Sequence, residues 1–316
     1  MNVRGQASKV RIVVPDLASN SYFPAVAAVE LGTFRDVGLD AEVELLFPVD
    51  AAYRALAEGA VDVVAGSAHS ALAGFPEWEG VKLLAAQGQG MYWFLVMSSE
   101  LAAERGDLEA VRGRTIGAAP WVDFGLQQLL VDGGIDLDRD RVDIRPVPGA
   151  AQAGTNFGLT AARALAAGEV DGFWANGMGA EVAIVSGNGS LVLDVRRGDG
   201  PSGCFDYTFA SLAATEQYVG ADPERATAIV RGLRAAQKLL AEDPERALSV
   251  GERIFEPEHN RLIARLIARD APFYDAAIDA RTVASMNRFA RARGLLEGDP
   301  SYEQVVATEL APVWAE

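Results

Sequence analysis

A stretch that occurs twice constrains this chain most. Residues 55–67 and 164–176 both begin with Ala-Leu-Ala-x-Gly-x-Val-Asp. In each copy a helix is expected to end at the glycine, where the backbone needs a positive φ. A short apolar run typical of a buried strand follows, and the copies close on Ser67 and Asn176, two good helix N-caps. The repeat predicts two similar α/β units, each with a helix N-terminus at the end of a strand; the alternative is a chance match between alanine-rich helices.

The segments around the repeat alternate between strands and helices. Val10–Val14 and Ala41–Phe47 are typical of strands, and Tyr22–Leu31 between them is typical of a helix. This order predicts parallel strands covered by helices. The expected fold class is α/β and two-lobed: each lobe is a mostly parallel sheet flanked by helices, and the lobes are joined by two crossovers.

Two glycine-rich breaks, at residues 87–90 and 198–203, indicate where the chain passes between the lobes. We expect residues 1–91 and 208–316 to form the first lobe and residues 92–207 the second, with a ligand cleft between them. The C-terminal tail is expected to be helical, to complete the first lobe and to pass over its surface. Its helices are predicted to start at Asp222 and Asp243 and to span Val283–Leu295 and Tyr302–Trp314.

Composition excludes several classes of function. The formal net charge is −16 and no basic cluster is present, which disfavours nucleic acid and anionic membranes as partners. The single cysteine and two distant histidines lack the spacing of a metal site, so neither a metal nor a cofactor is expected. No apolar run is long enough to insert in a membrane. No secretory signal is seen, so the protein is expected to be cytoplasmic if Met1 is the native start, and periplasmic or extracytoplasmic if a signal was removed.

The loops that follow the strands supply the candidate ligand-binding residues, because ligands of open α/β sheets bind there. The set is aromatic and polar and contains no Lys or Arg, which favours a neutral or singly charged ligand. Asp123 or Asp206 is expected to accept a hydrogen bond from the ligand. The candidates are Ser19, Asn20, Ser21, Tyr22, Ser67, His69, Gln89, Tyr92, Trp121, Asp123, Phe124, Trp174, Asn176, Asp206 and Tyr207.

Several of these residues also have a purely structural interpretation. Trp121 and Trp174 could be core residues, since large aromatic side chains dominate cores. Asp123 could be only a helix N-cap, and His69 a capping or solvated histidine. Cys204 is expected to be an inert thiol.

Residues 24–43 carry a resemblance to a known family. A helix is followed by Gly32-x-Phe34-x-x-x-Gly38-Leu and an alternating strand, which resembles the solute-binding proteins of ABC transporters for sulfonates, nitrate and taurine. That group includes relatives that handle thiamine pyrimidine precursors. The repeat, the strand that begins at Arg114 and the helix that begins at Asp222 are also similar to this family, so the resemblance covers most of the chain. It implies a two-lobed periplasmic-binding-protein-like architecture that closes on a small molecule by hinge motion.

The same fold also carries enzymes. When the chain is matched to an aromatic sulfinate desulfinase of this fold, the nucleophilic cysteine of that enzyme falls at Ser19. The cysteine-rich iron motif of the thiamine pyrimidine synthase is absent from this sequence. Neither chemistry is therefore expected here.

The function expected is binding without catalysis. The ligand would be a small heteroaromatic or organo-sulfur/nitrogen compound, and an ABC permease is the expected partner if the protein is exported. Trp121, Trp174 and Tyr22 would stack on the ligand, while Ser67, Asn176 and the backbone N–H groups after them would donate hydrogen bonds. The alternative is a cofactor-independent lyase or decarboxylase acting on an aromatic acid, with His69, Asp206 or Cys204 as acid or base.

Overall fold

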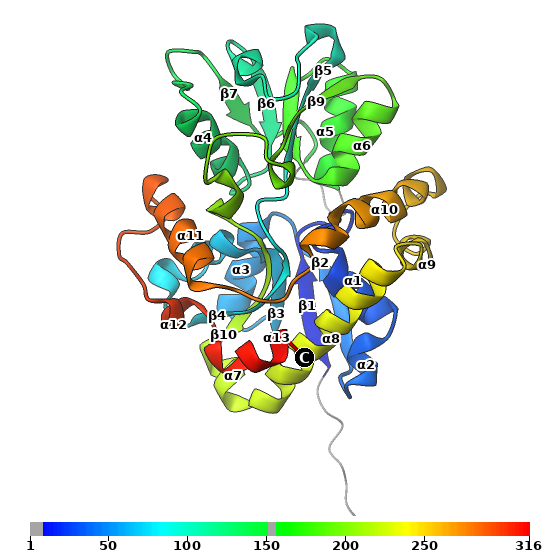
Figure 1. Cartoon of the computed structure of the whole chain (residues 1–316), viewed down its shortest axis with the longest axis vertical. Helices are drawn as coiled ribbons and strands as arrows, with labels where there is room; N and C mark the ends of the chain where they lie inside the picture. The colour runs from blue at the N-terminus through cyan, green and yellow to red at the C-terminus, as the bar shows by residue number, and fades with distance from the viewer. Residues whose placement is uncertain (1–8, 151–155) are drawn as a thin grey trace, which may run out of the picture.

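Two five-stranded sheets form the centres of two lobes in a computed structural model, which describes residues 9–150 and 156–316 (Figure 1). In the first lobe the strand order is β2 (Ala41–Leu45), β1 (Val10–Val14), β3 (Val63–Ser67), β10 (Ala210–Thr215) and β4 (Val81–Gly88). In the second lobe it is β7 (Asp143–Arg145), β6 (Thr115–Ala118), β8 (Gly172–Ala175), β5 (Phe94–Ser98) and β9 (Gly189–Asp194).

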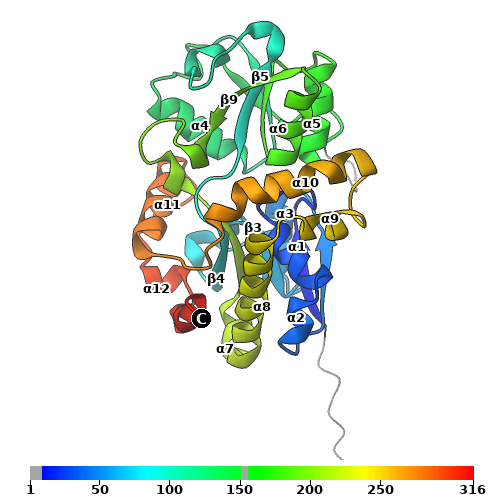
Figure 2. The same cartoon turned by 45° about the vertical axis from the view of Figure 1, so that its right-hand side comes forward.

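Helices flank both sheets (Figures 1 and 2). The first lobe has α1 (Phe23–Glu30), α2 (Thr33–Asp36) and α3 (Val49–Ala57), and the second has α4 (Asp123–Asp132), α5 (Phe157–Ala166) and α6 (Gly177–Val185). The helices after β10 are α7 (Glu216–Ala221), α8 (Pro223–Glu242), α9 (Arg246–Gly251), α10 (Pro257–Asp270), α11 (Ala280–Ala292), α12 (Tyr302–Val305) and α13 (Ala311–Trp314). Short 3₁₀ helices include η1 (Ala68–Ala73), η5 (Val195–Arg197) and η6 (Cys204–Tyr207).

The expected α/β class with mostly parallel strands is confirmed, with one exception in each sheet. β10 is antiparallel to both of its neighbours, and so is β5, whereas the other four strands of each sheet run in one direction. Both exceptions are the first strand that the chain forms after it passes from one lobe to the other. A strand that enters a sheet from the opposite lobe runs against strands whose carboxyl ends face that lobe, so the crossovers explain both reversals.

The repeat corresponds to the same structural unit in each lobe. Residues 57 and 166 end α3 and α5, and β3 and β8 begin at equivalent positions, residues 63 and 172. Gly59 and Gly168 have φ values of 71° and 70°, as the sequence predicted. The runs expected as strands, Val61–Ala65 and Val170–Ala175, become strands two residues later, at Val63 and Gly172, because the chain bends at Asp62 and Asp171.

The aspartate of the repeat joins neighbouring strands by hydrogen bonds, a role that the motif alone did not predict. Asp62 accepts a 2.8 Å hydrogen bond from the backbone N–H of Arg11, and Asp171 accepts one of the same length from Thr115. The backbone N–H groups of Asp62 and Asp171 in turn donate to the carbonyls of Arg11 and Thr115. In each lobe this pair of bonds joins two parallel strands at their amino ends.

We expect Asp62→Ala to lower the free energy of unfolding by about 1–2 kcal/mol, because the Arg11 N–H loses its acceptor at a part-buried position. Urea denaturation measures the change. Asp62→Asn is the matched control, since its amide oxygen still accepts the bond and should retain most of the stability. Equal losses in both variants would contradict this role.

Two parts of the C-terminal tail differ from the prediction. The expected helix over Tyr302–Trp314 is interrupted, because Val306 pairs with Leu83 as a β-bridge and the Ala307 N–H donates to the Leu83 carbonyl at 3.0 Å. The expected helix start at Asp243 is also wrong, because residues 243–245 form a turn before α9. The start at Asp222 is confirmed by a side-chain cap to the Arg225 N–H at 3.0 Å.

The tail also reaches beyond the first lobe. α8 packs on α1 and α2, but α10 packs on α6 of the second lobe, and α11 packs on η6 between the lobes. Both views show α10 passing directly beneath the second lobe (Figures 1 and 2). The tail therefore also contacts the second lobe, which the sequence did not predict.

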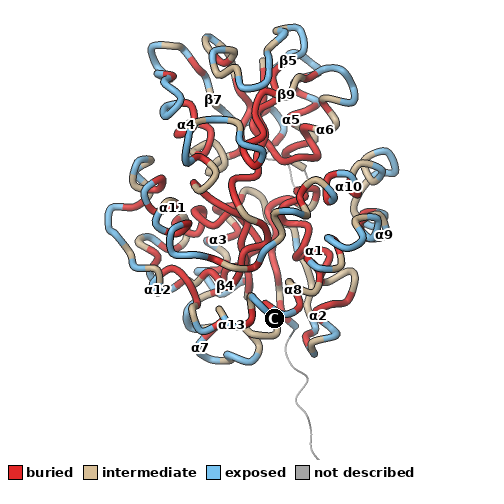
Figure 3. The backbone as a smooth tube through the Cα atoms, viewed as in Figure 1, coloured by how far each residue is buried: buried red, intermediate tan, exposed pale blue. Residues whose placement is uncertain are grey.

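Buried backbone runs through both sheets and through the segments that join them (Figure 3). These segments connect β4 to β5 and β9 to β10, and the lobe boundaries proposed from the sequence, after residues 91 and 207, fall inside them. Within residues 9–150 and 156–316, no helix combines the length and apolar character needed to cross a membrane.

Candidate functional site

An inner cavity lies between the lobes, at the carboxyl ends of strands from both sheets. Its volume is about 40 Å³, enough for only a few water molecules at ~10–15 Å³ each, so the lobes are closed over it. It is lined by Pro15, Asp16, Ser19, Tyr22, Phe47 and Val49 from the first lobe, and by Trp93, Ala119, Pro120, Val122, Phe157, Ala175 and Asn176 from the second lobe and its first connection.

Four helices begin at the wall of the inner cavity. Val49 and Phe157 are the first residues of α3 and α5, and Val122 and Asn176 are the N-cap residues of α4 and α6. The N-terminus of a helix carries a partial positive charge and unpaired N–H groups. The wall is therefore suited to a hydrogen-bond acceptor or a single negative charge, although no cationic side chain lines it among the residues that the structure describes.

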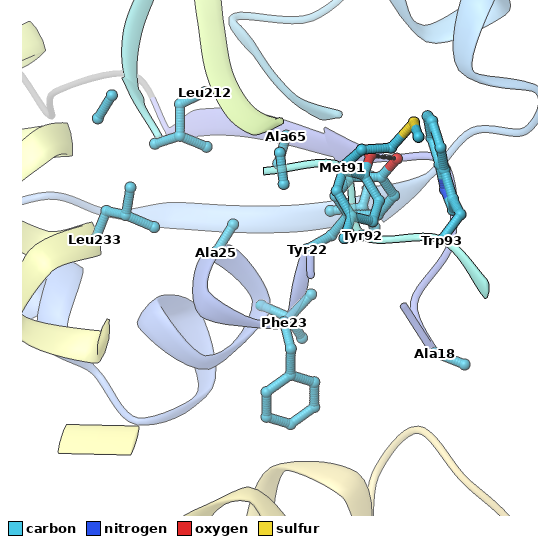
Figure 4. Close-up of a cluster of buried hydrophobic side chains, with 14 of the residues drawn as sticks. Ala18, Tyr22, Phe23, Ala25, Ala65, Met91, Tyr92, Trp93, Leu212 and Leu233 are labelled. Carbon is cyan, nitrogen blue, oxygen red and sulfur yellow. Dashed lines mark hydrogen bonds between the residues drawn. The ribbon is translucent and has the colours of Figure 1, made fainter. Parts of the chain in front are cut away.

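Aromatic rings form much of the remaining wall. The hydroxyl groups of Tyr22 and Tyr92 lie 2.6 Å apart, and the ring centroids of Tyr92 and Trp93 are 4.7 Å apart (Figure 4). Phe47 of the first lobe stacks on Phe157 of the second, with centroids 6.1 Å apart and planes 19° apart. Rings contributed by both lobes are suited to enclosing a flat apolar group.

The side-chain hydroxyl of Ser19, at the wall of the inner cavity, has no hydrogen-bond partner within the part of the chain that is described. The residue is 1% exposed, and its Oγ is buried. A buried hydroxyl without a partner costs about 1–3 kcal/mol. A ligand group in the inner cavity would remove that penalty.

Asp16 joins the lobes at the edge of the inner cavity. One carboxylate oxygen accepts a hydrogen bond from the Asn156 side chain and the other accepts one from Asn176, each at 2.5 Å. The same two asparagines cap α5 and α6, through the N–H groups of Leu159 at 3.0 Å and Gly179 at 3.2 Å. Burial raises the pKa of Asp16 to about 7, and its hydrogen bonds oppose this rise only in part.

A larger cavity, the outer chamber, adjoins the inner cavity and shares Asp16 with it. Its volume is about 360 Å³. It is lined by Asp16, Leu17, Ala18, Leu45, Asn156, Leu159, Thr160, Arg163, Ile254, Phe255, Glu256 and His259.

The structure brings together only part of the predicted ligand-binding set. Ser19, Tyr22 and Asn176 line the inner cavity, and Tyr92 lies behind this wall with its hydroxyl 2.6 Å from that of Tyr22. Asn176 caps α6 as predicted. The N–H group of Gly177, expected to face a ligand, donates to the Asn20 side chain at 3.0 Å instead.

Ser67, the counterpart of Asn176 in the repeat, is not at the inner cavity. Its hydroxyl lies 2.6 Å from that of Ser70, and it makes no capping bond to η1. The next backbone N–H, of Ala68, donates to the carbonyl of Phe209 at 2.9 Å. The chain returning from the second lobe thus covers this helix start, and a single-lobe pattern carries no sign of it.

Asn20, Ser21 and Gln89 belong to a buried polar network between the two connections. Its centre is Arg196, whose side chain is 1% exposed and lies 3.0 Å from Asp270. Arg196 also donates to the Gln89 carbonyl at 2.7 Å and to Ser21 at 3.3 Å. The Asn20 side chain donates to Asp270 as well. The expectation of a site region without basic residues therefore needs correction: an arginine from η5 is buried behind the wall, although it does not line the inner cavity.

His69 is a structural link between the lobes. Its Nε2 lies 3.0 Å from the Trp121 carbonyl, which can only accept, so Nε2 carries the proton and Nδ1 accepts from the Thr208 hydroxyl at 2.9 Å. The ring of Trp121 lies 6.4 Å from that of His69, and Trp121 has a φ of 69°. Trp121 does not line the inner cavity in this closed arrangement.

Burial lowers the pKa of His69 to about 4, from 6.5 in the unfolded chain. Only the unfolded chain then binds this proton between those pH values. The stabilising effect of neutral His69 is therefore complete above pH 6.5 and is lost as the pH falls toward 4, by roughly 3 kcal/mol in total.

We expect the difference in unfolding free energy between the wild type and His69→Gln to rise with pH across this window. His259→Gln is the control, and a difference independent of pH would contradict the assignment.

The remaining candidates lie in packed or peripheral positions. Trp174 is fully buried in β8 with its ring 6.2 Å from that of Trp93, the core placement that the sequence left open. Asp123 is the first residue of α4 and accepts from Gln127 at 2.8 Å, and Phe124 packs on Trp121 with ring centroids 5.7 Å apart.

The residues of η6 lie against α11, away from the inner cavity. Tyr207 stacks on Phe289 with centroids 5.0 Å apart and donates to Asp132. Burial raises the pKa of Asp206. The Cys204 thiol is buried, with a pKa raised to about 11, which fits an unreactive cysteine.

Four residues with polar or aromatic side chains line the inner cavity but were not among the candidates. Asp16 lies in the loop after the first strand, so the rule that selected Ser19 could have selected it too. Trp93 directly follows the predicted Tyr92. Phe47 and Phe157 carry no local signal, because only the packing of the two lobes brings their rings together.

Comparisons with known proteins bear on the fold. Neither protein-family models nor curated protein sequences match this chain. Among solved structures, a Bordetella bronchiseptica RB50 protein is similar over 96% of both chains, with 20% identity and a TM-score of 0.72. The alkanesulfonate-binding protein SsuA from Xanthomonas axonopodis pv. citri, bound to MOPS, is 15% identical over 97% of this chain and 98% of its own, with a TM-score of 0.72. The periplasmic nitrate-binding protein NrtA from Synechocystis PCC 6803 is 13% identical over 98% of this chain and 89% of its own, with a TM-score of 0.71. The chain therefore has the two-lobed fold of periplasmic substrate-binding proteins, as the resemblance in its sequence implied.

Proposed function

We propose that this protein is a solute-binding protein that closes its two lobes on one small, neutral or singly charged molecule. The observation that carries this proposal is the inner cavity, which is built by strand-end loops of both lobes and contains the unpaired Ser19 hydroxyl. A site divided between two lobes forms completely only when they close, so closure and ligand contact are coupled.

The lining limits the chemistry of the ligand. Asp16 is the one charged side chain among the described residues that line the inner cavity, and it is negative when ionised. A multiply charged anion would meet no basic side chain there. A single sulfonate or carboxylate could still be held by the helix N-termini, and an uncharged nitrogen heterocycle could stack on the rings and bond to Ser19. We therefore propose a heteroaromatic or organo-sulfur/nitrogen compound.

The volume of about 40 Å³ implies that the lobes separate to admit such a molecule. The two connections, residues 89–93 and 195–209, are where we expect the hinge to lie. Similarity to proteins that bind alkanesulfonates and nitrate supports an uptake role, in which this protein would act outside the cytoplasm and an ABC permease would be its partner.

Thermal shift with pyrimidines, thiamine precursors and alkanesulfonates tests the proposal. A true ligand stabilises by RT ln(1 + [L]/Kd), about 2.7 kcal/mol at a hundredfold excess over Kd. Ser19→Ala should weaken that ligand by about tenfold, because a buried hydrogen bond is lost. Ser99→Ala, at an exposed serine of the second lobe, is the control. Stabilisation by sulfonates alone would contradict the preference for heterocycles, and stabilisation by none would contradict the proposed function.

The enzymatic alternative has no observation in its favour. Of the described residues that line the inner cavity, none is His69, Asp206 or Cys204. Both ring nitrogens of His69 are engaged, and burial disfavours the Cys204 thiolate. We therefore propose binding without turnover.

A further inference from the structure

The outer chamber is the larger of the two adjoining cavities, at about 360 Å³ against about 40 Å³. With the lobes closed, the inner cavity has room for only a small part of an organic molecule, whereas the outer chamber matches the size of ordinary ligand sites, ~300–1,000 Å³. It is formed by the loop after β1, by α5 of the second lobe and by the start of α10. Closure of the lobes therefore shapes both spaces.

The side chain of Asp16 borders both cavities. Its carboxylate accepts a 2.5 Å bond from the amide of Asn156, which lines the outer chamber.

The outer chamber is lined by a cationic side chain, which the inner cavity lacks, as well as by the carboxyl groups of Asp16 and Glu256. Arg163 of α5 lines the chamber, and no hydrogen bond or ion pair is recorded for it within the described residues. The apolar side chains of Leu159 and Phe255 line the same chamber. An apolar linker could pass along these side chains to an anionic group at Arg163.

We propose that the outer chamber is a second subsite, and that the ligand is elongated: a flat head in the inner cavity, an apolar linker past Asp16, and a carboxylate or sulfonate paired with Arg163. This inference rests on the proposed function, since the head occupies the inner cavity. It names Arg163 as the residue that selects an anionic end.

Two matched probes test the inference by calorimetry: 3-(pyridin-3-yl)propane-1-sulfonate and 3-(pyridin-3-yl)propan-1-ol, which share head and linker. The wild type should bind the sulfonate about tenfold more tightly than the alcohol, the effect of one charge-assisted bond. Arg163→Gln should abolish this preference and leave the affinity for the alcohol unchanged. Arg145→Gln removes an exposed positive charge from the same lobe outside the chamber and should preserve the preference.

The outcomes separate the two proposals. If the alcohol binds but the sulfonate has no advantage, or if the advantage survives in Arg163→Gln, the second subsite is wrong and the proposed function stands. If neither probe binds the wild type, the second subsite is overturned together with the proposed heteroaromatic preference. If Arg145→Gln lost the preference for the sulfonate as fully as Arg163→Gln, the preference would be a general effect of charge. That result would also overturn the second subsite.

Discussion

Replacing Asp270 by Ala is expected to lower the free energy of unfolding by about 3–5 kcal/mol, the cost of leaving a buried charge unpaired. The partner is Arg196, 3.0 Å away, and both side chains are 1% exposed. Arg196 also holds the carbonyl of Gln89, so this ion pair joins the connection between β9 and β10 to that between β4 and β5 and to the end of α10. Asp270 further accepts from Asn20. A single substitution therefore disturbs the junction of both connections.

Urea denaturation of three variants separates the ion pair from a general loss of packing. Arg196→Met combined with Asp270→Ala should recover part of the stability, since an uncharged pair leaves no buried charge. Glu316→Ala breaks the exposed ion pair with Arg231, with side chains 43% and 49% exposed, and should cost less than about 1 kcal/mol. If Asp270→Ala lost no more stability than Glu316→Ala, the network would not have the role assigned to it.

The second large effect is expected from the titration of Asp16. Its pKa is raised from 3.8 to about 7 in the folded protein, so between these values only the native state binds the proton. The unfolded chain binds fewer protons there, so this contribution to stability is complete below pH 3.8 and is lost as the pH rises to about 7. The loss is about 1.4 kcal/mol per pH unit, roughly 4 kcal/mol in total. The contribution of Asp16 to the free energy of unfolding therefore falls with rising pH, whereas that of His69 rises.

The measurement is the difference in unfolding free energy between the wild type and Asp16→Asn, followed from pH 4 to pH 8. Asparagine cannot titrate, so the difference isolates this one carboxyl from the others. As the pH rises, the wild type should lose stability relative to Asp16→Asn, and the difference should become constant above about pH 7. Asp138→Asn, at an exposed carboxyl, is the control and should give a small and even difference. A difference independent of pH for Asp16→Asn would contradict the raised pKa.

Much of the fold could be predicted because it follows from local patterns. The repeat placed the ends of α3 and α5 and the positive φ at Gly59 and Gly168, and the cap at Asn176 is confirmed. These features depend on backbone conformation and capping, to which neighbouring residues in the sequence contribute most. The break at Val306 was missed, because its cause is a strand more than two hundred residues earlier in the chain.

The candidate site was predicted less well, for the same physical reason. Ser19, Tyr22 and Asn176 were found because strand ends in α/β proteins face the ligand. Arg196 was missed, since an arginine in a short 3₁₀ helix normally lies in solvent, and only the presence of Asp270 makes its burial tolerable.

The sequence by itself determined two equivalent α/β units and placed Ser67 and Asn176 at matching positions at the ends of β3 and β8. Only the tertiary structure decided that they differ. Beside β3, the Phe209 carbonyl of the returning chain accepts the N–H that follows Ser67, whereas Asn176 lies at the inner cavity and binds Asp16 of the other lobe. Hydrogen bonds between distant segments arise from how the lobes pack, and a local sequence pattern carries no record of that packing.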